Sequence, residues 1–267
     1  HGVMSAKPVL ILVGTRPEAI KMSPIILRLQ QSTVLRPVIC STGQHKEMLS
    51  QTLADFNISP DVELAVMQPG QTLMGLAGRL FLGLEKTIGE IAPACILVQG
   101  DTATAYIGAV CGFYARIPVG HVEAGLRSGD MYAPYPEEFN RKSISLAATW
   151  HFAPTRGAAE NLRQEGVAAD TIIVSGNTVV DALMYMRDAI RQTPPPLPEA
   201  LENIFRSNAK YVLITSHRRE NFGQGIEDIC SAIATLALSH PGCFFVFPVH
   251  LNPQVQSVVE QHLTNLP

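Results

Sequence analysis

The sequence predicts an α/β protein built on doubly wound parallel sheets. Strand-length apolar runs alternate with helix-length segments, polar or glycine-rich motifs follow several of these runs, and charged residues make up only 16% of the 267 residues. A typical soluble protein has roughly 25% charged residues, so the low share indicates sheets that are buried on both faces. The alternation implies right-handed crossovers between parallel strands.

Each expected strand is a short apolar run, and each expected helix repeats its apolar residues every three or four positions. The expected strands cover residues 8–13, 35–40, 62–66, 94–99, 117–122, 150–153, 171–175, 211–215 and 243–249. The expected helices cover residues 17–31, 45–55, 71–91, 102–115, 136–148, 156–165, 178–192, 226–239 and 254–264. Helical spacing is clearest in Leu73, Leu76, Leu80 and Leu84.

A proline-rich segment marks the expected boundary between two domains. Residues 194–198 read P-P-P-L-P, which cannot continue a helix and forms a stiff, extended linker. Residues 7–193 are expected to form a complete N-terminal domain. Residues 199–267 contain only two expected strands, so we expect them to be the start of a second domain that is truncated in this chain.

Composition argues against several classes of protein. The net charge of −3 disfavours nucleic-acid binding. The chain has no apolar run of about 18 residues and no basic-then-apolar leader, so we expect neither a membrane span nor a signal peptide, and a cytoplasmic location. Five cysteines without a C-x-x-C motif are expected to be reduced, and the eight histidines form no metal-binding pattern.

Five polar or glycine-rich motifs each follow an apolar stretch. They are G-T-R-P-E-A from Gly14, G-D-T from Gly100, G-H-V-E-A-G-L-R from Gly120, S-G-N-T from Ser175 and S-H-R-R-E-N from Ser216. The carboxyl ends of parallel strands meet at one edge of a sheet, and open α/β sheets bind their ligands there. The motifs therefore predict a binding site at this edge.

The motif from Gly14 fits a phosphate site. A tight turn leads into a helix whose free N–H groups can face an anion, and Arg16 and Lys21 can add positive charge. An ordinary strand–helix turn with exposed charges is the alternative. The motif is not G-x-G-x-x-G, so a nicotinamide cofactor is not expected.

Asp101 and Glu123 are candidates for proton transfer, because burial or a nearby charge shifts a carboxyl pKa. Asp101 could instead cap the helix that begins at Thr102. Glu123 could instead form an ion pair with Arg127. Gly120 and Gly125, on either side of Glu123, are expected to leave room for a ligand.

Two further motifs contain candidate residues. Glu137 lies in P-E-E-F-N-R at the start of an expected helix, where two carboxylates would also suit the helix dipole. His217 is followed by Arg218 and Arg219 at a strand end, which indicates anion binding. His250 lies at the next strand end, in P-V-H-L-N-P.

Taken together, these strings resemble the non-hydrolysing UDP-N-acetylglucosamine 2-epimerases of bacteria. The resemblance extends from about Pro8 to Pro253 and also includes G-Q-H from Gly43, Q-P-G-Q from Gln68 and S-G-N-T-V-V-D-A-L from Ser175. It implies two Rossmann-like domains that face a cleft, as in GT-B glycosyltransferases. It also implies reversible conversion to UDP-N-acetylmannosamine through elimination of UDP and a 2-acetamidoglucal intermediate, for cell-envelope polysaccharide synthesis, without a cofactor or metal.

The resemblance also implies roles for individual residues. Asp101, Glu123 and Glu137 would transfer protons, His217 would contact the UDP phosphates, and Arg16 and Lys21 would hold substrate. Some family members bind UDP-N-acetylglucosamine as an activator as well as a substrate, and the family suggests a homodimer. The positions that match the activator site are Gln44, His45, Gln71, Glu137, Arg218 and His250.

Three alternatives stay open at this stage. A hydrolysing epimerase would release N-acetylmannosamine and UDP, a nucleotide-sugar glycosyltransferase would need an acceptor, and a binding module would hold the nucleotide sugar without turnover. Family chains continue beyond the point that corresponds to Pro267, into a region that grips the uridine and ribose. Loss of those contacts predicts that the 267-residue chain alone is inactive.

Overall fold

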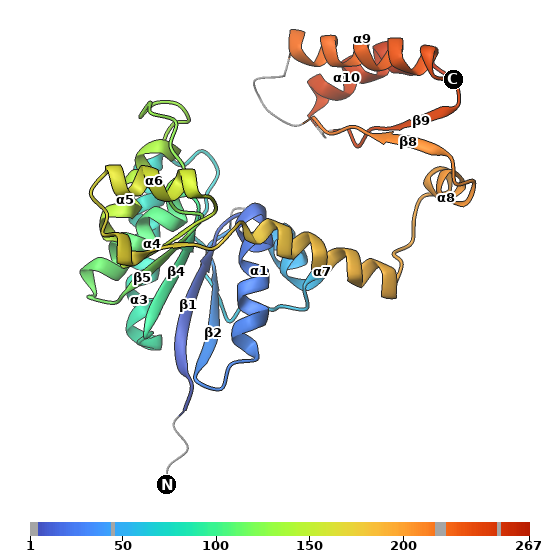
Figure 1. Ribbon diagram of the computed structural model, residues 1–267. Coiled ribbons are helices and arrows are strands. Elements are labelled where there is room, and N and C mark those ends of the chain that lie inside the picture. Colours follow the sequence, from blue (N-terminus) through green and yellow to red (C-terminus); the bar gives the residue numbers. More distant parts are fainter. Residues whose placement is uncertain (1–4, 44–45, 217–222, 250–251) are drawn as a thin grey trace. The chain divides into compact units, whose positions relative to one another are not determined.

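The computed structural model describes residues 5–43, 46–216, 223–249 and 252–267. The chain divides into two compact units, His1–Thr193 and Pro194–Pro267, called unit 1 and unit 2 below (Figure 1). Unit 1 contains a wide parallel sheet with helices on both faces, so the predicted α/β class is confirmed.

Unit 1 is built on a seven-stranded sheet with the order β3-β2-β1-β4-β5-β6-β7. All neighbouring strands in it are parallel. The strands are β1 Lys7–Val13, β2 Leu35–Ser41, β3 Val62–Glu63, β4 Cys95–Gln99, β5 Val119–Val122, β6 Trp150–Ala153 and β7 Ile172–Val174. The chain progresses in one direction from β1 to β3 and in the other from β4 to β7. The direction reverses between β1 and β4, and α/β sheets bind ligands at such a point.

Helices cover both faces of this sheet (Figure 1). They are α1 Arg16–Gln30, α2 Lys46–Asp55, α3 Leu73–Ile91, α4 Ala103–Tyr114, α5 Glu137–Ala147, α6 Arg156–Gln164 and α7 Thr178–Gln192, with a short 3₁₀ helix at Ala169–Thr171. Threonine hydroxyls cap α1, α3, α4 and α6, and Asn177 caps α7. Such caps satisfy N–H groups that have no partner inside the helix.

The alternating side chains of β1 fill two separate cores. Leu10 and Leu12 pack with α3, α4 and α5 on one face, whereas Val9, Ile11 and Val13 pack with α1, α2 and α7 on the other. Side chains of a strand alternate between the faces of its sheet, so an uninterrupted apolar run suits a strand that is covered on both sides. This is the arrangement that the low content of charged residues predicted.

Several boundaries differ from the predicted ones. The third strand ends at Glu63 rather than at residue 66, because β3 is an edge strand that pairs only with Cys40 and Ser41 of β2. The fifth strand begins at Val119 rather than at residue 117, because the Ile117 amide donates to the carbonyl of Gly112 at the end of α4. The helix α8, Glu199–Arg206, was not predicted; it is short and largely exposed.

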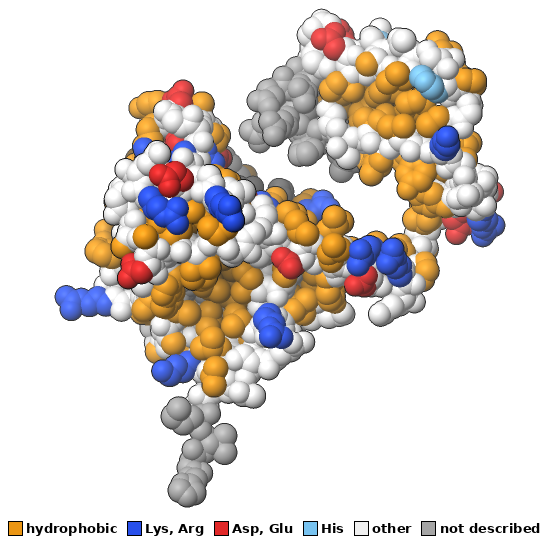
Figure 2. Space-filling model, in the orientation of Figure 1, with side chains coloured by type: hydrophobic (Ala, Val, Ile, Leu, Met, Phe, Trp, Pro, Cys, Tyr) orange, Lys and Arg blue, Asp and Glu red, His pale blue; other side chains and the backbone are white. Residues whose placement is uncertain are grey.

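Unit 2 contains β8 Lys210–Leu213 and β9 Cys243–Val246, which are parallel, with α8, α9 Gln224–Ser239 and α10 Pro253–Leu263. Its core is small and centres on Ile226, Cys230 and Val255. Large apolar side chains of both strands are exposed, among them Leu213 and Phe244. Hydrophobic side chains also gather on the face of this unit that Figure 2 shows. The described part of unit 2 therefore leaves much apolar surface uncovered.

Candidate functional site

A pocket opens in unit 1 at the carboxyl ends of β1, β4 and β5, where the strand order reverses. Its volume is about 210 Å³. It is lined by Thr15, Pro17, Glu18, Lys21, Gln99, Gly100, Asp101, Thr102, Glu123, Leu126 and Arg141. Three of the predicted site residues, Lys21, Asp101 and Glu123, thus line one pocket. They come from α1 and from the turns after β4 and β5.

Glu123 directly follows β5 and points its carboxylate at Lys21. Oε2 of Glu123 accepts a hydrogen bond from Nζ of Lys21 over 2.8 Å and another from the side-chain amide of Gln99. The backbone of Glu123 has a φ of 67°, a strained conformation for a residue with a side chain, and such residues cluster at functional sites. The alternative of an ion pair with Arg127 is wrong, because Arg127 bonds to Glu165 instead.

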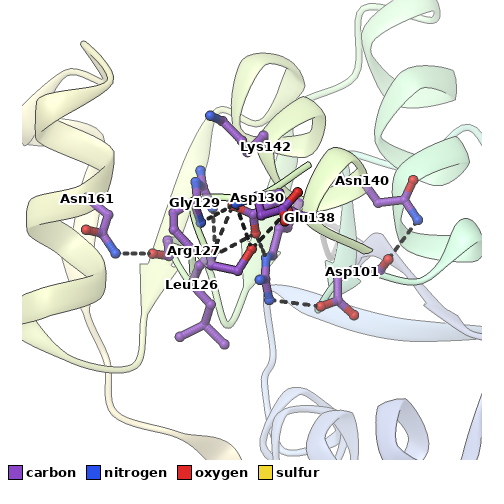
Figure 3. A network of polar contacts seen from close by, with 12 residues as sticks. Asp101, Leu126, Arg127, Gly129, Asp130, Glu138, Asn140, Lys142 and Asn161 are labelled. Carbon is purple, nitrogen blue, oxygen red and sulfur yellow. Dashed lines mark hydrogen bonds and ion pairs between the residues drawn. The ribbon is translucent and has the colours of Figure 1, made fainter. Parts of the chain in front are cut away.

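Asp101 lies in the turn after β4, which Gly100 makes with a φ of 73°. The helix-cap alternative for Asp101 is wrong, because the hydroxyl of Thr102 caps α4. Asp101 is instead held by α5: its carboxylate accepts from Nη1 of Arg141 over 3.4 Å, and its carbonyl accepts from Nδ2 of Asn140 over 2.9 Å (Figure 3).

The pKa of Asp101 is raised, chiefly by burial. The charge of Arg141 opposes this shift, whereas the negative charges of Glu137 and Glu123 add to it. A raised pKa makes a carboxylate a stronger base, which suits a group that has to remove a proton. The electrostatics of the pocket therefore suit proton transfer.

Of the two adjacent glutamates that begin α5, Glu138 is the buried one. It is 1% exposed and accepts hydrogen bonds from the amides of Ser128 and Gly129 and from Nε of Arg141 (Figure 3). Burial acts to raise the pKa of Glu138, but these donors outweigh it and lower the pKa. Glu137 is half-buried and does not line the pocket. Sequence reasoning missed Glu138, whose only signal was its place beside Glu137.

Two further predicted residues, Arg16 and Gln71, lie outside the pocket. Arg16 is exposed at the first position of α1 and does not line the pocket. Gln71 precedes α3, where it accepts from Arg79 and contacts the sulfur of Met67. The other predictions fall on Gln44, His45, His217, Arg218 and His250, all outside the described residues.

Glu18 is a second buried carboxyl group that sequence reasoning missed. It lines the pocket and is 1% exposed. Burial raises its pKa from 4.5 to about 7, although hydrogen bonds from Thr102, Thr15 and Gly14 act in the opposite direction. The spacing of Thr15 and Glu18 resembles a capping box, which was the available signal in the sequence.

The glycines beside Glu123 make room for protein rather than for a ligand. A Cβ atom at Gly120 would lie 2.6 Å from Leu97, inside the sheet. A Cβ atom at Gly125 would lie 2.2 Å from the carbonyl oxygen of Ala158 in α6, and Gly125 has a φ of 90°. The expectation that these glycines admit a ligand is therefore wrong.

Gly125→Ala is expected to lower the free energy of unfolding by at least about 2 kcal/mol, because it combines backbone strain with a clash against α6. Urea denaturation of both proteins measures the difference. Gly129→Ala is the control for conformational strain alone, since Gly129 has a φ of 83° but no atom within 4 Å of an added Cβ. Equal losses in the two variants would contradict a steric role for Ala158.

His121 of β5 connects the two loops that carry Asp101 and Glu123. It is fully buried, and its Nε2 lies 2.7 Å from the carbonyl oxygen of Gly100, so Nε2 carries the hydrogen. Burial lowers the pKa of His121 to about 4. Among the described residues, Nδ1 of His121 and Nδ1 of neighbouring His151 are buried without a hydrogen-bond partner.

The low pKa of His121 predicts a loss of stability in acid. As the pH falls from 6.5 to about 4, the unfolded chain binds a proton that the folded chain does not. The difference corresponds to about 3 kcal/mol of unfolding free energy. The raised pKa of Glu18, which moves from 4.5 to about 7, has the opposite effect, because it stabilises the folded chain as the pH falls. The test therefore compares the unfolding free energies of wild type and His121→Gln by urea denaturation at pH values from about 4 to about 7. Parallel pH profiles would refute this assignment.

Three further features concern the chain beyond this pocket. Within the described ranges, no group of three or more His, Cys, Asp or Glu side chains could hold a metal ion. No helix in the part of the chain that the structure describes is both long and apolar enough to cross a bilayer. On the face that Figure 2 shows, Lys and Arg lie scattered among Asp and Glu rather than in a basic stripe.

Comparison with known proteins supplies independent information. The family model described as UDP-N-acetylglucosamine 2-epimerase matches residues 27–267. The chain is 47% identical over 260 residues to the UDP-N-acetylglucosamine 2-epimerase of Yersinia pestis, an alignment that covers 97% of this chain and 69% of that protein. It is 45% identical over 257 residues to the protein of the same name from Escherichia coli K12, with coverages of 96% and 68%. The crystal structure of UDP-GlcNAc 2-epimerase from Neisseria meningitidis bound to UDP-GlcNAc superposes with a TM-score of 0.86 at 42% identity, covering 97% of this chain and 70% of that one.

Proposed function

Because the chain belongs to the UDP-N-acetylglucosamine 2-epimerase family, we propose that it interconverts UDP-N-acetylglucosamine and UDP-N-acetylmannosamine by proton transfer in the pocket of unit 1. The reaction inverts the sugar carbon that bears the acetamido group. It is an isomerisation with no net oxidation or reduction, so it needs no redox cofactor.

The observation that carries this proposal is the placement of Asp101 and Glu123 in one pocket beside Lys21. Inversion at a ring carbon needs a base that removes a weakly acidic proton and an acid that returns a proton to the opposite face. Two carboxyl groups on neighbouring turns can divide these tasks between them. Glu137 is the third candidate for one of these tasks.

The leaving group is UDP in this proposal. Anti elimination breaks the bond between the sugar and the diphosphate and yields 2-acetamidoglucal, to which UDP adds back after the proton has returned. Lys21 lies in the pocket and Arg16 at the exposed start of α1, so both are proposed to hold the diphosphate, whose negative charge grows as the bond breaks. Contact between His217 and the phosphates stays a prediction from sequence.

Assembly and regulation are further parts of the proposal. We expect unit 1 to form a homodimer, and we expect unit 2 to supply the nucleotide-binding side of the enzyme. The exposed apolar side chains Leu82, Phe113 and Leu146 on α3, α4 and α5 support an interface on unit 1. A second UDP-N-acetylglucosamine is proposed as an activator, with Gln71 and Glu137 among the residues that bind it. A cytoplasmic enzyme of this kind would supply cell-envelope polysaccharide synthesis.

The test is incubation of the natural protein that carries this sequence with UDP-N-acetylglucosamine alone in heavy water. The expected products are UDP-N-acetylmannosamine and substrate that carries deuterium at the acetamido-bearing carbon. Free N-acetylmannosamine with UDP would indicate a hydrolysing epimerase, and a requirement for an acceptor would indicate a glycosyltransferase. Tight binding without deuterium incorporation would overturn the proposal in favour of a binding module.

A further inference from the structure

Glu18 lies at the pocket yet takes no part in the chemistry proposed above. Its carboxyl group lines the same cavity as Lys21, Asp101 and Glu123, and it is almost completely buried. A carboxylate loses much of its hydration at such a position and is stable there only when protein donors replace the water. The identity of those donors indicates what Glu18 contributes.

Two threonine hydroxyls and the Gly14 amide hold the carboxylate, and the Thr15 amide contributes as well. Oε2 accepts from Oγ1 of Thr15 over 2.7 Å and from the Gly14 amide over 3.0 Å, and Oε1 accepts from Oγ1 of Thr102 over 2.7 Å. Both hydroxyls are also helix caps: Thr15 accepts from the Glu18 amide in α1, and Thr102 accepts from the Ala105 amide in α4. A hydroxyl has a single hydrogen. While Glu18 is ionised, neither threonine can therefore donate to a ligand.

A proton on Glu18 would reverse one of these hydrogen bonds. Of the three hydrogen bonds described above, two end on Oε2 and one ends on Oε1, so the proton is accommodated most easily on Oε1. The acid would then donate to Oγ1 of Thr102, which keeps its bond from Ala105 as a second acceptor contact. The hydrogen of Thr102 becomes free to point into the pocket, which Thr102 lines.

The surroundings favour this proton when an anion binds. Burial already raises the pKa of Glu18 to about 7. The other charged groups in the pocket are Lys21 of α1, Asp101 after β4, Glu123 after β5 and Arg141 of α5. The formal charges of these four side chains sum to zero. Three other ionisable side chains lie on elements around the pocket but do not line it. They are Arg16 at the start of α1, Glu137 at the start of α5 and buried His121, whose ring contacts the carbonyl oxygen of Gly100. A diphosphate would add negative charge beside Glu18 and favour its neutral form.

We propose that Glu18 is a positioning residue of this pocket, which on taking up a proton turns the Thr102 hydroxyl into a hydrogen-bond donor for the diphosphate of a bound nucleotide sugar. The inference rests on the proposed function, since it concerns the same pocket and ligand. Glu18 acts through Thr102 and does not itself touch the reacting carbon. Nucleotide-sugar binding is therefore linked to the uptake of one proton.

Calorimetric titration with UDP-N-acetylglucosamine measures this linkage in the natural protein that carries this sequence. Repeating the titration in buffers with different ionisation enthalpies gives the number of protons taken up. For wild type, Kd is expected to rise by up to about tenfold per pH unit above the pKa of Glu18. Glu18→Gln imitates the protonated acid, because its amide oxygen can accept from Gly14 and Thr15 while its NH₂ group donates to Thr102. This variant should keep the low-pH affinity and lose most of the pH dependence.

Three matched variants sharpen the result. Thr102→Val should weaken binding at low pH, because it removes the donor. Asp101→Asn should retain the pH dependence of Kd. This result would show that the proton is taken up by Glu18 and not by Asp101, the other pocket carboxyl group with a raised pKa. Glu85→Gln, on the exposed part of α3, controls for a change of charge alone and should match wild type.

The possible outcomes separate this inference from the proposed function. Wild-type binding whose pH dependence is unchanged in Glu18→Gln overturns the inference and leaves the proposed function intact. If Glu18→Gln does not fold, equal low-pH affinities of Thr102→Val and wild type overturn it instead. Wild-type protein that neither binds nor epimerises the nucleotide sugar overturns both.

Discussion

Glu123→Gln is expected to lower epimerase turnover by about 10²–10⁴-fold, the usual contribution of a general acid or base. The substitution preserves the shape of the side chain but removes its ability to take a proton. It also leaves Nζ of Lys21 without the carboxylate that now lies 2.8 Å away. Deuterium incorporation from heavy water measures removal of the ring proton. Formation of UDP-N-acetylmannosamine from UDP-N-acetylglucosamine measures the complete reaction.

Parallel measurements on Asp101→Asn and Glu137→Gln assign the proton-transfer steps. A variant that loses deuterium exchange altogether identifies the base for the first step. A variant that exchanges the proton but forms no epimer identifies the acid on the opposite face. Glu165→Gln is the control, because Glu165 pairs with Arg127 away from the pocket. Wild-type turnover in both Asp101→Asn and Glu123→Gln would contradict the assignment of the pocket as the active site.

Glu138→Ala is expected to reduce the free energy of unfolding by about 3–5 kcal/mol, the range for breaking a buried ion pair from one side. The change leaves the Ser128 and Gly129 amides without their acceptor and removes the partner of Nε of Arg141. Arg141 in turn contacts Asp101, so the variant should also lose activity. Urea denaturation and the epimerase assay measure these two effects.

The neighbouring residue offers a matched control for this prediction. Glu137→Ala removes the same side chain one position earlier in α5, at a half-buried site. It should change stability by much less, about 0.5 kcal/mol, as is usual for substitutions away from buried networks. Similar losses in both variants would show that α5 depends on the charge of its first turn rather than on the contacts of Glu138.

The sequence was sufficient to predict most of the fold, since hydrophobic periodicity reports burial directly. The run Pro8–Val13 is apolar throughout because β1 is covered on both faces. Apart from the unpredicted helix α8, the errors lie where pairing or capping decides a boundary. β3 is short because it is an edge strand with one partner, and the start of β5 depends on a backbone hydrogen bond from Ile117. Neither effect has a periodic signature.

The candidate site was predicted in part. Asp101 and Glu123 come directly after β4 and β5, and Lys21 lies in α1, the helix that follows β1, so topology alone brings them to one edge of the sheet. Glu18 and Glu138 were overlooked because their importance comes from complete burial, and a helix-initial glutamate normally faces solvent. Which of two adjacent glutamates turns inward depends on the path of the Ser128–Gly129 loop that Glu138 binds. A single sequence does not encode that path in any local pattern.

The left-handed backbone of Glu123 has an evolutionary consequence. Glycine or asparagine adopts such a conformation with less strain, so the fold by itself would favour one of them at this position. Random drift under selection for folding alone should therefore erase the glutamate. Its retention in a lineage would be a sign that the lineage still selects for a carboxylate at that point.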